Sequence, residues 1–291
     1  MSPSTIRKVV IPAAGWGTRF LPVTKVVPKE VLPIIDQPVI AYALQEAALT
    51  GLSEVVLVTS EHKEAIENYF RPNPELEAFL TGKGDQRRLE LLHKLTQLPR
   101  VTTVLQRQQL GLGHAVLVAR EAVGREAFAV LLPDDVVEAP VPALKQLLRV
   151  HAQYGCSVLA VVKVPKSEVS RYGVIDPEVA GPKTYRVKGV VEKPRAADAP
   201  SDLAIIGRYI FTPEIFDELV TVRPGAIGEI QLTDGIAALL KRQPVYAVEL
   251  EGQLLDAGTP LGLLKASVQT ALRRPDMGPE LRAWLEATLR G

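Results

Sequence analysis

Cysteine and histidine are scarce in this chain. Cys156 is the single cysteine among 291 residues, and the four histidines are His62, His93, His114 and His151. One cysteine excludes a disulfide within the chain and any metal site built from several thiolates. The histidines are scattered, without the spacing that metal ligands show. The composition therefore gives no support to a disulfide framework or to a cysteine–histidine metal centre.

The chain also lacks a dominant charge and long hydrophobic runs. Lys and Arg number 34 and Asp and Glu number 33, which leaves a formal net charge of +1. A nearly neutral protein has no electrostatic bias toward nucleic acids or acidic membranes, so local clusters must bind any anion. No apolar run approaches the ~20 residues of a membrane span. Residues 1–8 show no signal-peptide core. We therefore expect a cytoplasmic enzyme without nucleic-acid or membrane partners.

The opening stretch carries the strongest local signal. A short apolar run at 9–11 predicts a buried strand, and it leads into a turn that contains Gly15 and Gly17. Glycines let backbone N–H groups close on an anion. Arg19 and Lys29 supply cations that suit phosphate oxygens. The stretch therefore predicts a cradle for a polyphosphate.

Two other phosphate-binding motifs do not fit this stretch. A Walker A loop requires G-x-x-x-x-G-K-[ST], which is missing here. A dinucleotide fingerprint requires a third glycine where Phe20 stands. On Gly15 and Gly17 alone, a plain strand-to-loop turn would be the better interpretation. The cradle hypothesis therefore rests on the longer stretch.

Alternating strand and helix patterns predict an α/β fold. A helix expected from Asp36 and a strand at 54–59 continue the first strand as β-α-β, which favours a parallel sheet covered by helices. From 170 to 212 the pattern changes to paired antiparallel strands, and two amphipathic helices follow between 260 and 290. We interpret residues 72–98 as a polar helical insertion. We expect a Rossmann-like mixed, mostly parallel central sheet with helices on both faces, a small antiparallel subregion and C-terminal helices.

Two acidic turns follow predicted strands. Asp134 and Asp135 come directly after the buried run 127–132, and Asp256 comes soon after a strand at 244–250. Acids that directly follow a buried strand lie at the carboxyl edge of an α/β sheet, where ligands bind. The alternative for Asp134 and Asp135 is a capped turn, which is common.

The stretch from Gly15 to Pro33 reads G-x-G-T-R-x-x-P-x-T-x-x-x-P-K-E-x-L-P. It resembles the signature of the sugar-phosphate nucleotidyltransferase family. Its Pro28-Lys29-Glu30 triplet is most similar to that of the bacterial UTP–glucose-1-phosphate uridylyltransferases, also called UDP-glucose pyrophosphorylases. Later landmarks follow in the family's order, so the resemblance covers nearly the whole chain. These landmarks lie at 107–115, 132–134, 172–174, 191–194, 228–234 and 255–259.

The resemblance implies a division of the chain. A nucleotidyltransferase domain is expected at 1–265, with a nucleotide half at 1–140 and a sugar-phosphate half at 141–265. A helical segment at 266–291 is expected to follow. The landmark at 228–234 is expected to be mainly architectural.

The resemblance also implies which side chains act. Arg19, Lys29 and Lys193 are expected to be catalytic. Asp134 and Asp256 are expected to converge on one Mg²⁺ ion, which prefers a few carboxylates together with phosphate oxygens and water.

Gln108 and the backbone of Gly111 are expected to read the base. A glutamine amide offers a donor and an acceptor, as does the edge of uracil. The implied nucleotide-binding set is Ala13, Ala14, Gly15, Gly17, Thr18, Arg19, Lys29, Gln108, Gly111 and Asp134, and the implied sugar-phosphate-binding set is Gly173, Glu192 and Lys193.

The implied reaction joins UTP and glucose 1-phosphate to give UDP-glucose and pyrophosphate. The attacking phosphate oxygen is already anionic, so catalysis would consist of positioning and charge neutralisation. A glucose-1-phosphate thymidylyltransferase is the alternative within the class, because uracil and thymine differ by one methyl group. A non-catalytic nucleotide-sugar-binding regulatory subunit is the alternative outside it. We also expect a homo-oligomer.

Overall fold

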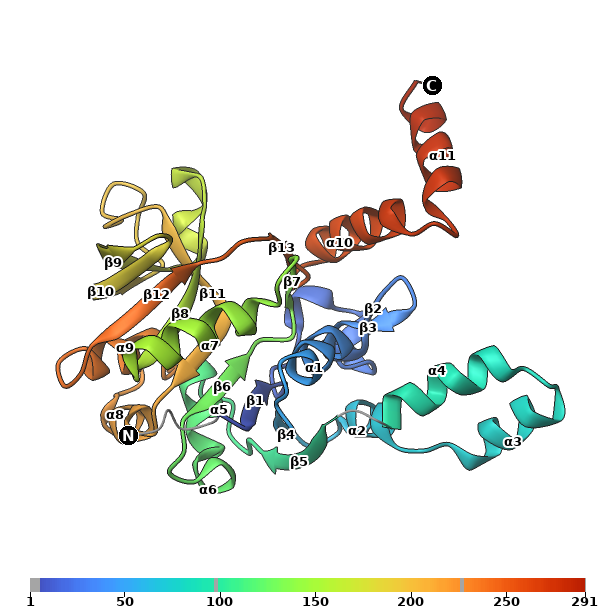
Figure 1. Ribbon diagram of the computed structural model, residues 1–291, viewed down its shortest axis with the longest axis horizontal. Coiled ribbons are helices and arrows are strands. Elements are labelled where there is room, and N and C mark those ends of the chain that lie inside the picture. Colours follow the sequence, from blue (N-terminus) through green and yellow to red (C-terminus); the bar gives the residue numbers. More distant parts are fainter. Residues whose placement is uncertain (1–5, 97–98, 226–227, 291) are drawn as a thin grey trace.

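A nine-stranded sheet forms the centre of the molecule (Figure 1). The computed structural model describes residues 6–96, 99–225 and 228–290. Parts of three predicted segments lie outside the described residues. They are residues 1–5 of the N-terminal stretch, residues 97–98 of the expected insertion and residue 291 of the C-terminal segment. In spatial order the strands are β5 (Arg100–Leu105), β4 (Glu54–Thr59), β1 (Lys8–Pro12), β6 (Phe128–Leu131), β11 (Leu203–Phe211), β8 (Ser157–Lys163), β12 (Val245–Glu249), β10 (Thr184–Glu192) and β9 (Gly173–Gly181).

The sheet is mixed, as expected, but it is not mostly parallel. Among the neighbouring strands of the described residues, β5–β4, β4–β1, β1–β6 and β8–β12 are parallel, and the other four pairs are antiparallel. Parallel pairing needs a long crossover, whereas antiparallel strands can be joined by a short turn. Only two residues, Pro182 and Lys183, separate β9 from β10. The expectation of a mostly parallel sheet therefore holds for the first four strands and is wrong for the sheet as a whole.

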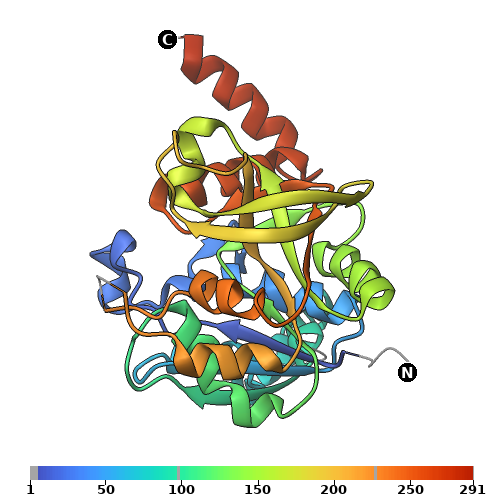
Figure 2. The same cartoon turned by 90° about the vertical axis from the view of Figure 1, so that its left-hand side faces the viewer.

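The expected antiparallel subregion closes into a small barrel. Strand β9 pairs with β10 over most of its length, and it also reaches β11, where Val174 pairs with Ala204. Strands β11, β8, β12, β10 and β9 thus form a closed ring. Figure 2 shows β9 and β10, in yellow, arching over this half of the molecule.

Helices cover both faces of the sheet, as the sequence predicts. In β1, Val9, Val10 and Ile11 are fully buried and alternate between the faces. Val10 belongs to the core beneath α5 (Leu112–Val118), α8 (Glu214–Thr221) and α9 (Leu232–Leu239). Val9 and Ile11 belong to the core beneath α1 (Val39–Leu49) and α7 (Ala143–Tyr154).

Smaller elements complete the fold. Helix α1 begins at Val39 rather than at Asp36, because Gln37 and Pro38 form a short strand that pairs back onto residues 33–34. The remaining elements are β2 (Pro33–Ile34), β3 (Gln37–Pro38), β7 (Asp135–Glu138), β13 (Gln253–Asp256), α2 (Glu64–Phe70), α3 (Pro74–Gly82), α4 (Gln86–Thr96), α6 (Arg120–Val123), α10 (Pro260–Arg273), α11 (Gly278–Arg290) and the 3₁₀ turns η1 (Thr18–Phe20), η2 (Val23–Lys25), η3 (Lys29–Val31) and η4 (Lys166–Arg171).

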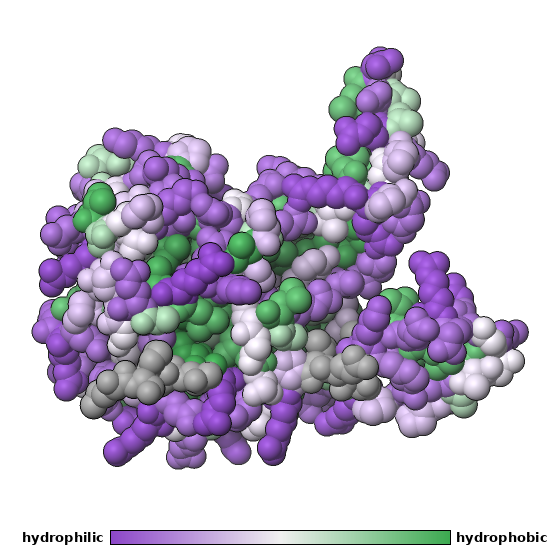
Figure 3. All heavy atoms as spheres, viewed as in Figure 1, coloured by the Kyte–Doolittle hydropathy of each residue, from purple (hydrophilic) through white to green (hydrophobic). Residues whose placement is uncertain are grey.

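Two arms leave the body of the molecule (Figure 1). Helices α3 and α4 form one arm, which is largely hydrophilic in the space-filling view (Figure 3). It corresponds to the insertion expected at 72–98. Helix α11 forms the other arm. Among the described residues, no helix combines the length and the apolarity needed to cross a bilayer.

A buried ion pair joins the helices to the sheet beside the acidic turn. Arg208 on β11 is 1% exposed, and its Nε lies 2.9 Å from Oε2 of Glu46 on α1. The guanidinium also donates to the carbonyl of Leu132, at 2.9 Å, just before Asp134. The other Glu46 oxygen accepts from the backbone N–H of Leu144 at the start of α7. This pair therefore ties α1, α7 and β11 to the segment that leads into the acidic turn.

Removing one partner of this pair should be costly. Arg208→Met should lower the free energy of unfolding by about 3–5 kcal/mol, because it leaves the Glu46 carboxylate buried without a counterion. Arg7→Met breaks an ion pair with Glu126 whose side chains are 58% and 43% exposed. That control should cost less than about 1 kcal/mol. Urea unfolding followed by circular dichroism measures both. Glu46→Met/Arg208→Met should recover much of the loss, and a double variant no more stable than Arg208→Met would contradict the account.

Candidate active site

Two adjoining cavities lie at the carboxyl ends of β1, β5 and β6. The first has a volume of about 480 Å³ and is lined by the glycine loop, which we define as residues 13–19, together with Lys29 and the start of α5. The second has a volume of about 610 Å³ and is lined by the start of β9, the end of β10 and the start of α9. Arg19, Asp134 and Gly258 line both cavities. The two cavities therefore meet at one cation and at the carboxylates of Asp134 and Glu229.

The glycine loop takes its shape from Gly17. Its φ of +66° lies in the left-handed region, which favours glycine. A Cβ at this position would also lie 3.1 Å from Cβ of Lys29. Gly17 thus lets the loop pass close to the lysine, which faces the same cavity.

An ion pair joins Lys29 and Asp134, two of the predicted site residues. The Nζ atom of Lys29 lies 2.6 Å from Oδ2 of Asp134. Burial lowers the pKa of Lys29, but the Asp134 and Glu30 carboxylates outweigh it and hold that pKa above its ordinary value. Burial likewise raises the pKa of Asp134, and the Lys29 ammonium outweighs it and holds the pKa below its ordinary value. Both groups are therefore charged near neutral pH.

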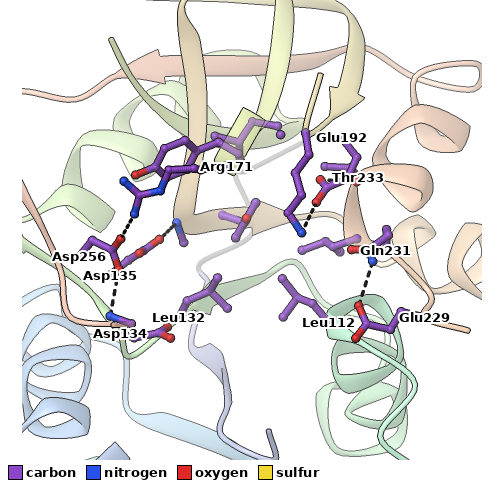
Figure 4. A pocket seen from close by; sticks show the side chains of 18 of the residues that line it. Leu112, Leu132, Asp134, Asp135, Arg171, Glu192, Glu229, Gln231, Thr233 and Asp256 are labelled. Carbon is purple, nitrogen blue, oxygen red and sulfur yellow. Dashed lines mark hydrogen bonds and ion pairs between the residues drawn. The ribbon is translucent and has the colours of Figure 1, made fainter. Parts of the chain in front are cut away.

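Asp134, Asp135 and Asp256 converge in the structure (Figure 4). Strands β7 and β13, which the sequence analysis did not predict, pair Asp135 directly with Asp256. A Cβ built on Gly258 would lie 3.1 Å from Oδ1 of Asp256 and 3.2 Å from Oδ2 of Asp134. The predicted convergence of Asp134 and Asp256 is therefore present in the geometry.

Asp135 is part of this acidic group, although the sequence analysis did not select it. Burial and the Asp134 carboxylate raise the pKa of Asp135 to about 6. Its Oδ2 accepts a 2.6 Å hydrogen bond from the backbone N–H of Gly207. Asp135 therefore links the acidic turn to β11.

Arg171 was also missed by the sequence analysis. It precedes β9, and its guanidinium lies 2.7 Å from Oδ2 of Asp256 (Figure 4). Each of the two predicted metal ligands thus has its own cation, Lys29 for Asp134 and Arg171 for Asp256. An exposed arginine next to Tyr172 carries no recognisable spacing, so only the fold reveals this contact.

The carboxylates of Asp134 and Asp256 can hold a divalent ion only together with oxygen atoms of a bound phosphate ligand and water. The residues that the structure describes contain no group of three or more His, Cys, Asp or Glu side chains arranged to hold a metal. Asp134 and Asp256 are two separate carboxylates at the junction of the cavities. Mg²⁺ is usually bound by one or two carboxylates plus phosphate oxygens and water, which is compatible with this arrangement.

The predicted sugar-phosphate residues lie together in the second cavity. Oε2 of Glu192 accepts a 3.0 Å hydrogen bond from the hydroxyl of Thr233, and Nζ of Lys193 lies 3.3 Å from Oε1 of Glu192 (Figure 4). A Cβ on Gly173 would lie 2.7 Å from Thr233 and 3.3 Å from Oε2 of Glu192, so a side chain there would displace both groups. Gln231 and Thr233 also line this cavity, so the landmark at 228–234 contributes side chains to its wall.

Two of the predicted nucleotide-binding residues do not line the cavities. Ala13, the first residue of the loop, is 1% exposed, and Gln108 is exposed, and neither of them lines a cavity. Gln106 and Gln109 line the first cavity instead. Gln106 is the first residue after β5, which is the signal that could have identified it. Gly111 lines the first cavity as predicted.

His114 holds the segment around Gln106. Its Nδ1 lies 2.9 Å from Nε2 of Gln106, which also donates to the carbonyl of Gly111. Burial lowers the pKa of His114, and a hydrogen bond with the backbone of Gln108 opposes that shift. A neutral histidine at the start of α5 therefore shapes the segment from 106 to 111.

Comparisons with known proteins identify the family of this chain. The family model described as Nucleotidyl transferase matches residues 8–272. The chain is 48% identical over 281 residues to the UTP–glucose-1-phosphate uridylyltransferase of Staphylococcus epidermidis, and the match covers 97% of this chain and 98% of that protein.

Two solved structures are similar over nearly their whole length. A UDP-glucose pyrophosphorylase complexed with UDP-glucose is 40% identical, with a TM-score of 0.85 over 93% of this chain and 100% of that chain. A UTP-bound UGPase from Acinetobacter baumannii is 38% identical, with a TM-score of 0.88 over 97% of this chain and 99% of that chain. The matching family model and these relatives show that the chain belongs to the nucleotidyl transferase family.

Proposed function

We propose that this protein transfers the uridylyl group of UTP to glucose 1-phosphate, giving UDP-glucose and pyrophosphate. The observation that carries the proposal is the meeting of two cavities at Arg19 and Asp134. One cavity has the backbone and cations that suit a triphosphate, and the other has a carboxylate and a lysine that suit a sugar phosphate. The names of the relative from Staphylococcus epidermidis and of the two similar structures support the same substrates.

The reaction needs alignment more than proton transfer. An oxygen of the sugar phosphate forms a bond to the α-phosphorus of UTP, the bond from that phosphorus to the β-phosphate bridge breaks, and its electron pair leaves with pyrophosphate. The attacking oxygen is already anionic, so no general base is required. Arg19 lies at the junction of the cavities, where it can neutralise charge as the phosphates approach. Lys29 lies in the first cavity, where it serves the triphosphate and the leaving pyrophosphate.

The second cavity would hold the sugar phosphate. Lys193 would bind the phosphate, and Glu192 would accept hydrogen bonds from sugar hydroxyls. The contact between Glu192 and Thr233 fixes the carboxylate for that task.

Base recognition falls to Gln106 and Gln109 in this proposal, in place of Gln108. Both line the first cavity near Gly111, and an amide matches the donor and acceptor pattern of uracil. Turnover of UTP and dTTP in competition distinguishes the uridylyltransferase from a thymidylyltransferase, because the two bases differ only by a methyl group.

A divalent metal ion, which we take to be Mg²⁺, is part of the proposal. Asp134 and Asp256 would hold it together with phosphate oxygens of the nucleotide. Bound there, it would supply charge neutralisation at the α-phosphate. The chain's own contribution is to pair each carboxylate with a cation, Lys29 for Asp134 and Arg171 for Asp256, until the ligands arrive.

The division into a nucleotide half at 1–140 and a sugar-phosphate half at 141–265 is also kept as a proposal. Most residues that line the first cavity come from the first half, but Glu229 and Gly258 line it as well. Each half would therefore present its own substrate and complete the other's cavity.

Lys193→Ala should separate the two substrates. Loss of a charged hydrogen bond to the sugar phosphate should raise KM for glucose 1-phosphate by about 10- to 100-fold. It should also lower kcat, because the same phosphate supplies the attacking oxygen. Steady-state kinetics measures both, and calorimetry should find UTP binding unchanged. Lys188→Ala, on β10 five residues before Lys193 and paired with Asp176, is the matched control and should alter neither parameter. Weakened UTP binding with normal glucose 1-phosphate kinetics would refute the assignment of Lys193.

Asp256→Asn tests the metal site. Turnover should fall by about a hundredfold or more, because a bound metal contributes several kcal/mol of charge stabilisation. EDTA should stop the wild-type reaction, and added Mg²⁺ should restore it. Asp176→Asn removes an exposed carboxylate that lines neither cavity, and it should keep full activity. Near-normal turnover of Asp256→Asn at ordinary Mg²⁺ concentration would remove this residue from the site.

The homo-oligomer is proposed to form through α10 and α11. A groove of about 460 Å³ between these helices is lined mainly by apolar residues, including Leu281 and Trp284. Helix α11 projects from the body, and Trp284 is 60% exposed (Figure 1). A second copy of this chain, offering the same apolar helix, fits such a self-complementary surface. Trp284→Lys should lower the mass measured by light scattering, whereas Val179→Lys, at a 78% exposed position on β9, should not. An unchanged mass in Trp284→Lys would rule out this surface.

A further inference from the structure

Lys63 lies beneath the glycine loop, immediately before α2, and the mechanism above does not use it. Its side chain is 9% exposed. The Nζ atom lies 2.6 Å from the carbonyl oxygen of Ala13, 2.7 Å from that of Gly15 and 2.9 Å from Oε2 of Glu30. A lysine ammonium has three N–H donors, and each of them has an acceptor here.

These contacts fix the direction of the loop's peptide groups. In a trans peptide the C=O and the following N–H point to opposite sides. Because the carbonyls of Ala13 and Gly15 point toward Lys63, the N–H groups of Ala14 and Trp16 point away from it. Within the residues that the structure describes, the N–H groups of Ala14, Gly15 and Trp16 donate no hydrogen bond. All three residues line the first cavity.

The carbonyl of Gly17, two residues after Gly15, is also bound by a side chain. The Thr24 hydroxyl donates a 2.9 Å hydrogen bond to the carbonyl of Gly17. The same peptide geometry turns the N–H of Thr18 to the opposite side. Three alternate carbonyls, those of Ala13, Gly15 and Gly17, are thus bound by side chains. This leaves a row of N–H groups of the kind that binds anions.

Glu30 balances the charge of Lys63. Its carboxylate is 1% exposed, and its Oε1 is buried and has no hydrogen-bond partner among the residues that the structure describes. Burial lowers the pKa of Lys63, and the Glu30 carboxylate opposes that shift. Burial also raises the pKa of Glu30, against the effect of Lys63 and Lys29. A buried ion pair of this kind contributes little to the stability of the fold, so its role is to be found in the hydrogen bonds that Lys63 makes to the loop.

We propose that Lys63 is a positioning residue that turns the N–H groups of the glycine loop toward the triphosphate. The proposal rests on the proposed function, since it takes the ligand of the first cavity to be a nucleoside triphosphate. Lys63 itself does not touch that ligand, because all three of its donors are used within the protein. It acts by preventing the loop's carbonyl oxygens from facing the phosphates.

Lys63→Met tests the proposal, because it keeps the aliphatic stem and removes the three donors. The dissociation constant of UTP, measured by calorimetry, should rise by about 10- to 100-fold, the range expected for losing hydrogen bonds to a charged group. Inorganic tripolyphosphate should lose affinity by a similar factor, because it offers the phosphates without the base. KM for glucose 1-phosphate at saturating UTP should stay unchanged. This pattern is not expected from a general loss of stability.

Ile66→Ala is the matched control. Ile66 is fully buried on α2, three residues after Lys63, so the substitution destabilises the same helix and removes none of the hydrogen bonds to the loop's carbonyls. It should lower the melting temperature and leave the UTP dissociation constant unchanged. Equal weakening of UTP binding in Ile66→Ala and Lys63→Met would overturn the proposal.

Two further variants separate the geometry of the three donors from the charge that carries them. Lys63→Arg keeps the charge, but its planar fork cannot direct three donors as an ammonium does, so UTP binding should still weaken. Wild-type affinity in Lys63→Arg would mean that only the charge matters, and it would overturn the proposal. Lys63→Met/Glu30→Met removes both buried charges and serves if Lys63→Met does not fold. Wild-type UTP affinity in this double variant would also overturn it. Failure of the unmodified protein to bind UTP would refute the proposed function instead.

Discussion

The ion pair between Lys29 and Asp134 is the contact on which the site depends. It joins the segment that follows the glycine loop to the turn that follows β6, and so it fixes the border between the two cavities. Three carboxylates, those of Asp134, Asp135 and Asp256, lie close to one another at this border. Without cations among them, their mutual repulsion would favour protonation or an open site. The paired cations therefore let three carboxylates lie close together at the border between the cavities.

Two buried ion pairs hold the backbone segments that form this border. Arg208 holds the carbonyl of Leu132, two residues before Asp134, and Glu46 holds Arg208. On the nucleotide side, Lys63 and Glu30 form a second buried pair under the glycine loop. Arg208 and Glu46 lie behind the residues that line the cavities, and in the second pair only Glu30 reaches the wall of the first cavity. In both pairs the buried cation donates hydrogen bonds to backbone carbonyls, so charge is buried at positions where it orients the backbone.

The sequence predicted the fold well where patterns are long and local. The strands predicted at 9–11 and 54–59 were placed correctly, because each is a sustained run rich in apolar residues. Strands β7 and β13 have four residues each and exist only because they pair with each other, 115 or more positions apart in the chain. Such pairing leaves no local periodicity, so Asp135 and Arg171 could not be linked to Asp256. Gln108 was chosen from the resemblance of the landmark at 107–115 to the family, and a resemblance in sequence does not show which amide side chain faces a cavity. The predicted roles of Arg19, Lys29 and Lys193 stay predictions, although all three line the cavities as expected.

The closure of β9 onto β11 has a consequence for how copies of this chain can meet. An open sheet presents a row of unpaired N–H and C=O groups at each edge, and another chain can pair with them. Here, among the described strands, one end of the sheet returns on itself, and β5 is left as the outermost strand at the other end. That strand carries Arg100, Thr102 and Thr103 as exposed polar residues. Adding a strand from a neighbouring molecule would therefore have to occur along this six-residue strand, where one exposed leucine, Leu105, lies beside three exposed polar residues, and this disfavours edge-to-edge aggregation.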